Sequence, residues 1–139
     1  MKRQILFRWI LFFAYVSAIF TLMIVKINPS EVEIPRYILG IEFDKLAHFF
    51  LFLPYAPLAW LAFSPGKLSS GVKLRLLIPI FFSGVTLGAL TEVAQMMTPF
   101  RNADIVDLST DILSLATGTL TLFLWLIIYG RIKRKRRSV

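Results

Sequence analysis

Side chains able to bind ligands or move protons gather in three short, separated segments of this chain. They comprise five carboxylates, two basic side chains, one amide and the only histidine. In chain order they are Asp44, Lys45, His48, Glu92, Gln95, Arg101, Asp104, Asp107 and Asp111. The absence of cysteine excludes a thiolate metal site and a cysteine nucleophile. We therefore expect one ligand-binding site built from carboxylates and cations.

Helical spacing and depth single out three of these residues as catalytic candidates. Asp44 and His48 lie four residues apart, so they share a helical face. Glu92 and Asp111 lie well inside their apolar segments, where a charge costs about 2.5–3.5 kcal/mol at a span centre and needs a partner. His48 or Glu92 would serve as a general base, with Arg101 stabilising the developing charge. The catalytic candidates are His48, Glu92 and Asp111.

Carboxylate oxygens are the ligands that Mg²⁺ and Ca²⁺ prefer. Acids of the second and third segments are therefore candidate ligands for such a divalent cation, and the sequence leaves open whether a metal binds. The candidate ligands are Glu92, Asp104, Asp107 and Asp111. Arg101 and Lys45 would hold a lipid phosphate through charge-assisted hydrogen bonds. The alternative is a purely structural role for some of these residues: Asp44, Asn102 or Asp104 would cap a helix, and Gln95 would join two helices.

Four uncharged apolar runs must position these segments. The chain is 57% hydrophobic and 17% charged, whereas soluble domains carry about 25% charged residues. Runs of this length suit membrane spans, and inside a bilayer the backbone must pair with itself, which favours helices. We predict an all-α, polytopic transmembrane four-helix bundle forming one domain over 1–139. The predicted spans are about 7–26, 46–64, 75–97 and 105–130.

The distribution of charge predicts the orientation in the membrane. With four spans, twelve of the sixteen basic residues fall on the side of both termini, without any acid. All eight carboxylates fall on the other side. The positive-inside rule therefore predicts an N-in/C-in topology in a bacterial cytoplasmic (inner) membrane, with the polar site extracytoplasmic. The basic tail after Gly130 is interpreted as an anchor to anionic lipid, not as a nucleic-acid-binding arm.

The spacing of the polar residues, together with two glycines, resembles the VanZ-like membrane proteins over about residues 43–120. The matching pattern is Asp44-Lys45-x-x-His48, Gly88-x-x-x-Glu92-x-x-Gln95, Arg101-x-x-Asp104-x-x-Asp107 and a later Gly118. Asp111 departs from this pattern, since the family usually has asparagine there. Ser114 stands where the family often has glycine, which predicts a looser helix contact. The resemblance implies a small polytopic membrane protein of a family named for a teicoplanin-resistance protein.

Three functional hypotheses follow. The site binds or modifies a cell-envelope molecule, a lipid phosphate or a glycan precursor, and so affects susceptibility to glycopeptide antibiotics. Alternatively, Glu92 and Asp111 relay protons in a small proton-coupled transporter or channel subunit. In the third hypothesis the chain is a non-catalytic envelope scaffold. Membrane lipids are expected partners in each case, and the sequence leaves the oligomeric state and the question of enzymatic activity open.

Overall fold

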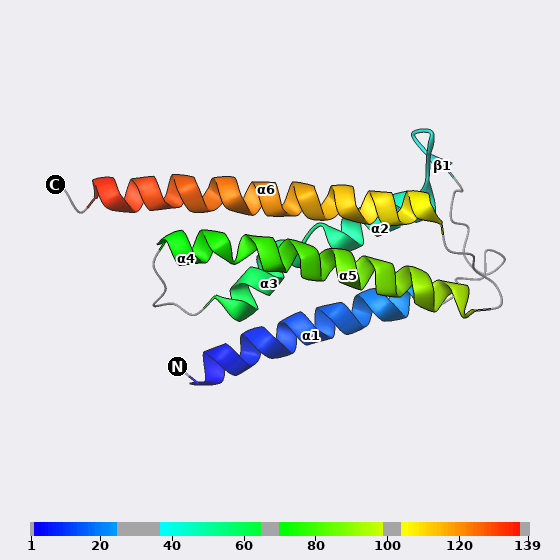
Figure 1. Cartoon of the computed structure of the whole chain (residues 1–139), viewed down its shortest axis with the longest axis horizontal. Helices are drawn as coiled ribbons and strands as arrows, with labels where there is room; N and C mark the ends of the chain where they lie inside the picture. The colour runs from blue at the N-terminus through cyan, green and yellow to red at the C-terminus, as the bar shows by residue number, and fades with distance from the viewer. Residues whose placement is uncertain (1, 25–36, 65–69, 99–103, 137–139) are drawn as a thin grey trace.

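The computed structural model describes residues 2–24, 37–64, 70–98 and 104–136. Four segments are long and apolar enough to cross a membrane, namely Lys2–Ile24, Phe43–Phe63, Gly71–Met96 and Ile105–Lys133. They pack side by side as a bundle (Figure 1). The chain is therefore an integral membrane protein, and the predicted four-helix architecture is confirmed.

The described segments form six helices and one short hairpin. In chain order they are α1 (Lys2–Ile24), β1 (Tyr37–Ile38), β2 (Ile41–Glu42), α2 (Phe43–Phe52), α3 (Tyr55–Phe63), α4 (Ser70–Arg75), α5 (Leu77–Met96) and α6 (Ile105–Lys135). The start of α1, α4 and the end of α6 lie at one end of the bundle, and the hairpin lies at the other (Figure 1). Leu39 and Gly40 both have positive φ in the two-residue turn, as a tight hairpin of this kind requires. The hairpin, with two residues in each strand, is a small addition to an otherwise all-α bundle.

The second span is broken between α2 and α3. Pro54 and Pro57 lack the N–H group that would continue the helical ladder, and the helix stops and restarts around Pro54. A hydroxyl from another helix reaches this break, because Tyr15 of α1 donates to the Leu51 carbonyl. The bend that the prolines predict is thus present, and a neighbouring helix supplies one of the missing donors.

Helix α6 packs against the same break from the other side. Ser114 is fully buried and its hydroxyl donates to the Phe49 carbonyl. The Leu53 carbonyl, which would bond to the N–H of residue 57 in an unbroken helix, lies against Gly118. A Cβ on Gly118 would overlap that oxygen. Ser114 therefore joins the two helices, and the prediction that it loosens their contact is wrong.

Two helix boundaries differ from the sequence-based expectation. The Gly/Ser-rich composition of residues 64–73 is typical of a turn, yet α4 is already helical from Ser70. Helix α6 also runs beyond the predicted end of its span, as far as Lys135. The side chains of Arg131, Lys133 and Lys135 are exposed. The helix therefore carries its basic residues out of the apolar zone rather than ending before them.

Candidate functional site

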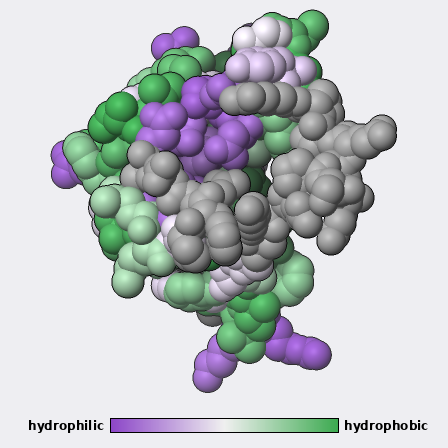
Figure 2. All heavy atoms as spheres, turned by 90° about the vertical axis from the view of Figure 1, so that its right-hand side faces the viewer, coloured by the Kyte–Doolittle hydropathy of each residue, from purple (hydrophilic) through white to green (hydrophobic). Residues whose placement is uncertain are grey.

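The candidate site lies at the hairpin end of the bundle, where α2 and α6 begin and α5 ends. Helix α6 makes extensive contacts with both α2 and α5. In the view onto this end, hydrophilic side chains gather on the face of the molecule (Figure 2). The described carboxylates here are Glu42, Asp44, Glu92, Asp104, Asp107 and Asp111. The remaining two acids, Glu31 and Glu33, lie outside the described residues. The fold therefore brings together the acids that the sequence places in separate segments.

Lys45 is surrounded by carboxylates. Its Nζ lies 3.0 Å from Glu42 Oε2, 3.1 Å from Asp107 Oδ1 and 3.3 Å from Asp104 Oδ2. These contacts join the hairpin and α2 to the first turn of α6. The sequence predicts that Lys45 holds a phosphate, but in the structure its charge is already compensated by three acids. Its clearest role is to hold the start of α6 against α2.

His48 and Asp111 form a buried pair in the centre of the site. Both side chains have 0% exposure, and His48 Nδ1 lies 3.0 Å from Asp111 Oδ1. When Asp111 is ionised it can only accept, so the Nδ1–H of His48 donates to it, and in the neutral imidazole Nε2 then keeps a free lone pair. Asp111 therefore offers the histidine a carboxylate as its acceptor. The ring is fixed in orientation and can act as a base or a metal ligand through Nε2.

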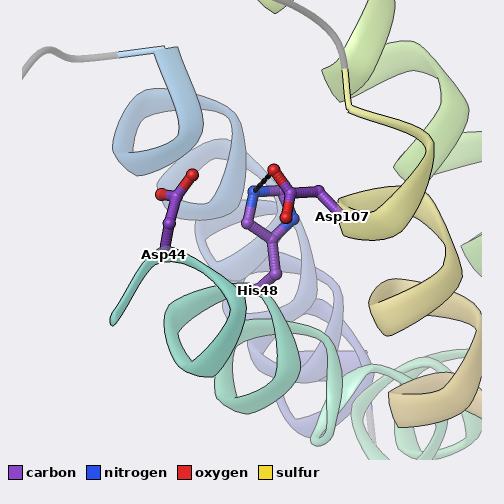
Figure 3. Close-up of side chains that lie close together, drawn as sticks. All are labelled: Asp44, His48 and Asp107. Carbon is purple, nitrogen blue, oxygen red and sulfur yellow. Dashed lines mark ion pairs between the residues drawn. The ribbon is translucent and has the colours of Figure 1, made fainter. Parts of the chain in front are cut away.

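The second ring nitrogen of His48 faces two further acids. Nε2 lies 4.0 Å from Asp107 Oδ2, and it has no hydrogen-bond partner among the described residues. Figure 3 shows Asp44 and Asp107 on either side of this nitrogen, contributed by α2 and α6. One ligand atom from each of Asp44, His48 and Asp107 lies within 4.8 Å of the other two. These three residues could hold a metal ion.

Glu92 links the end of α5 to the start of α6. Its Oε2 accepts the backbone N–H of Asp104 at 3.0 Å, and its Oε1 is buried without a hydrogen-bond partner among the described residues. Glu92 also forms a second group with His48 and Asp111 whose ligand atoms lie within 4.8 Å of one another. Burial of Glu92 and Asp111 agrees with the depth predicted from sequence. All three catalytic candidates therefore meet in one place.

Asp104 caps the N-terminus of α6. Its Oδ1 accepts the Val106 N–H at 2.8 Å, and its Oδ2 accepts from Lys45. The hydrogen bond from Val106, followed by the charge of Lys45, holds the pKa of the Asp104 carboxyl below its usual value. Both oxygens are thus engaged, so Asp104 is a poorer cation ligand than the sequence suggests. The capping interpretation describes this residue better.

A glycine brings α5 and α6 close together beside the buried pair. A Cβ on Gly88 would lie 3.2 Å from Asp111 Oδ2 and 3.4 Å from Asp111 Cβ. Distances of this kind leave little room for any larger residue at this position. Gly88 therefore belongs to the site through the close helix approach that it permits.

The remaining predicted residues lie apart or cannot be placed. Gln95 is buried, and its amide donates to the Met23 carbonyl of α1 at 3.2 Å. It therefore joins two helices, which is the structural alternative to a ligand-binding role for this residue. Arg101 and Asn102 lie outside the described residues. Sequence reasoning overlooked Glu42, although an acid three residues before Lys45 on a helix start is a recognisable pairing signal.

Comparison with known proteins adds no relative: no family model, no curated protein and no solved structure matches this chain. The functional argument therefore depends on the site alone.

Proposed function

We propose that this chain is a VanZ-like protein of the bacterial cytoplasmic membrane. Its acidic end faces the extracytoplasmic side and binds or modifies a cell-envelope molecule that carries sugar hydroxyls or phosphate. Glycopeptide antibiotics act on cell-wall precursors outside the membrane, so this activity would alter susceptibility to them. The polar residues of the family-like pattern support the proposal, because His48, Glu92 and Asp107 converge at one end of the bundle.

The single observation that carries this proposal is the separation of charge between the two ends of the bundle. The hairpin end holds the described carboxylates. The opposite end holds α4, the start of α1 and the end of α6, with their lysines and arginines (Figure 1). The positive-inside rule orients such a molecule with its basic end in the cytoplasm. A substrate reaching the acidic end would then come from the outer leaflet or the envelope.

The chemistry of the acidic end favours a ligand rich in hydroxyl groups. Ionised carboxylates only accept hydrogen bonds, and sugar hydroxyls donate them. A phosphate would be repelled by the acids unless a cation lies between them. Lys45 is already paired with three carboxylates, which leaves Arg101 as the other phosphate ligand that the sequence predicts. A lipid-linked glycan precursor combines both features.

Native mass spectrometry of protein extracted gently with its own lipids tests this function. We expect a co-purifying lipid that carries phosphate or sugar, released when Arg101→Ala is introduced. Arg131→Ala, at the basic end, is the matched control and should retain it. Detection of bulk phospholipids alone, bound equally by both variants, would contradict the proposal.

A further inference from the structure

We propose that Asp44, His48 and Asp107 form a binding site for a divalent transition-metal cation. Asp111 orients the histidine ring through its contact with Nδ1. The ligand atoms come from the first two turns of α2 and the first turn of α6, and they lie within 4.8 Å of one another. Figure 3 shows the imidazole between the two carboxylates. The proposal does not depend on the identity of the envelope ligand, because a cation would bind these residues with or without it.

The first argument is the unpartnered nitrogen of His48. The side chain is completely buried, and Nε2 has no hydrogen-bond partner among the described residues. A buried polar atom of this kind normally has a partner, and an ion is one explanation when none is present. The nitrogen points toward Asp107 Oδ2 at 4.0 Å. This distance is too long for a hydrogen bond. A tetrahedral metal with bonds of about 2.0–2.1 Å would separate the two atoms by about 3.3–3.4 Å, so the side chains would have to close by about 0.6 Å around the ion.

The second argument is the contact behind the ring. Metal-binding histidines almost always donate their other ring N–H to a carboxylate, a carbonyl or water, which fixes the tautomer and raises ligand basicity. Asp111 Oδ1 occupies that position, 3.0 Å from Nδ1. Because the two ring nitrogens point in diverging directions, a cation on Nε2 cannot also be bound by Asp111. This excludes the alternative group of His48, Glu92 and Asp111 as the ligand set for a cation on Nε2.

The third argument is charge. At this end of the described chain, acids from β2, α2, α5 and α6 outnumber the basic side chains Lys45 and His48. Lys45 binds Oδ1 of Asp107, so Oδ2 is the oxygen that faces the imidazole. A dication between Asp44 and Asp107 would reduce the repulsion among these carboxylates. It would also provide the missing positive charge for a phosphate at the same end.

The types of ligand atom in this site indicate which metal ions it would bind. Imidazole nitrogen suits Zn²⁺, Fe²⁺ and related ions, whereas Mg²⁺ and Ca²⁺ prefer all-oxygen sites. Three protein ligands leave a position open for water or substrate, which is the arrangement of catalytic rather than structural zinc sites. The sequence-based expectation of Mg²⁺ or Ca²⁺ on four carboxylates is therefore replaced by a mixed nitrogen–oxygen site. Asp107 is the ligand that both interpretations share.

The test measures binding of Zn²⁺ to detergent-purified protein stripped of lipid, by calorimetry and by metal analysis after gel filtration. We expect one Zn²⁺ per chain, not displaced by excess Mg²⁺ or Ca²⁺. His48→Gln and Asp107→Asn should weaken binding more than 100-fold, whereas Asp111→Asn should weaken it about 10–100-fold because it acts through the ring. Glu42→Gln is the matched control, since it removes an acid that contacts Lys45 but lies outside the ligand set.

X-ray absorption at the zinc edge of the wild-type protein keeps the test decisive if a variant fails to fold. One imidazole and oxygen ligands at about 2.0–2.1 Å would support the site. An all-oxygen shell, or no retained Zn²⁺, would overturn it. Loss of binding in Glu92→Gln with full binding in Asp44→Asn would overturn it as well, by moving the ion to the other side of the ring. The protein in this test carries no lipid, so a failure to bind zinc would not contradict the proposed envelope function. Native mass spectrometry tests that function separately.

Discussion

The buried contact between His48 and Asp111 shows how one residue type can decide the state of another. The sequence predicts that Asp44 and His48 share a helical face, because helix geometry fixes that relation within one segment. It cannot predict which of several acids on α6 lies next to Nδ1, since that depends on how α6 is rotated and shifted against α2. Only the packed structure identifies Asp111 as the acceptor.

Substitution of Asp111 tests this contact. Asp111→Leu keeps the branched shape of the side chain, although its methyl groups are bulkier than oxygens, and it leaves the Nδ1 proton of His48 buried without an acceptor, which costs about 1–3 kcal/mol. Asp111→Asn keeps a carbonyl oxygen as an acceptor and should be close to wild type. Thermal unfolding in detergent at neutral pH would measure both. Equal stability of the leucine variant and the wild type would show that the contact does not stabilise the fold.

At the scale of the elements, the prolines could be interpreted from sequence but their partners could not. Pro54 and Pro57 predict a break in the second span because neither donates a backbone hydrogen bond. Tyr15 and Ser114, which reach the carbonyls near this break, lie far away in sequence. Nothing in their local patterns distinguishes them from other hydroxyls in apolar helices. The sequence also gives little indication of the hairpin before α2, because a strand of only two residues is too short to show an alternating pattern.

Substitution of Gly118 tests the contact between α6 and the broken span. A Cβ at this position would overlap the Leu53 carbonyl, so Gly118→Ala must push the helices apart at a cost of about 1–3 kcal/mol. Gly130→Ala, on the same helix, is the matched control, because no atom from another described segment lies within 4 Å of its Cβ position. The control should be neutral or stabilise the helix by up to about 1 kcal/mol. Similar unfolding temperatures for the two variants would contradict this packing.

At the scale of the whole molecule, the helices and their apolar character follow directly from composition and charge spacing. Long uncharged runs leave few alternatives to membrane-spanning helices. The ends of the helices were harder to predict, because α4 begins inside a Gly/Ser-rich segment and α6 continues through basic residues. Those residues lie where the apolar pattern stops and gives no further information.

The orientation of the whole molecule is open to a direct test, since the chain has no native cysteine. Leu39→Cys places a thiol at the hairpin turn, where the side chain is 99% exposed. Gly71→Cys places one at the opposite end, in open space. A membrane-impermeant maleimide should label the first in intact spheroplasts and the second only after lysis. The reverse pattern would place the acidic site in the cytoplasm.

The interrupted second span has a consequence for biogenesis. A segment that enters the bilayer with unbonded carbonyls is a poor substrate for the translocon, because nothing in the lipid can donate to them. The Tyr15 hydroxyl is synthesised first and is available when this segment emerges, but the packing of Gly118 against the Leu53 carbonyl forms only with the last helix. Insertion of the second span is therefore expected to be completed late, and truncation before α6 would leave an intermediate exposed to quality-control proteases.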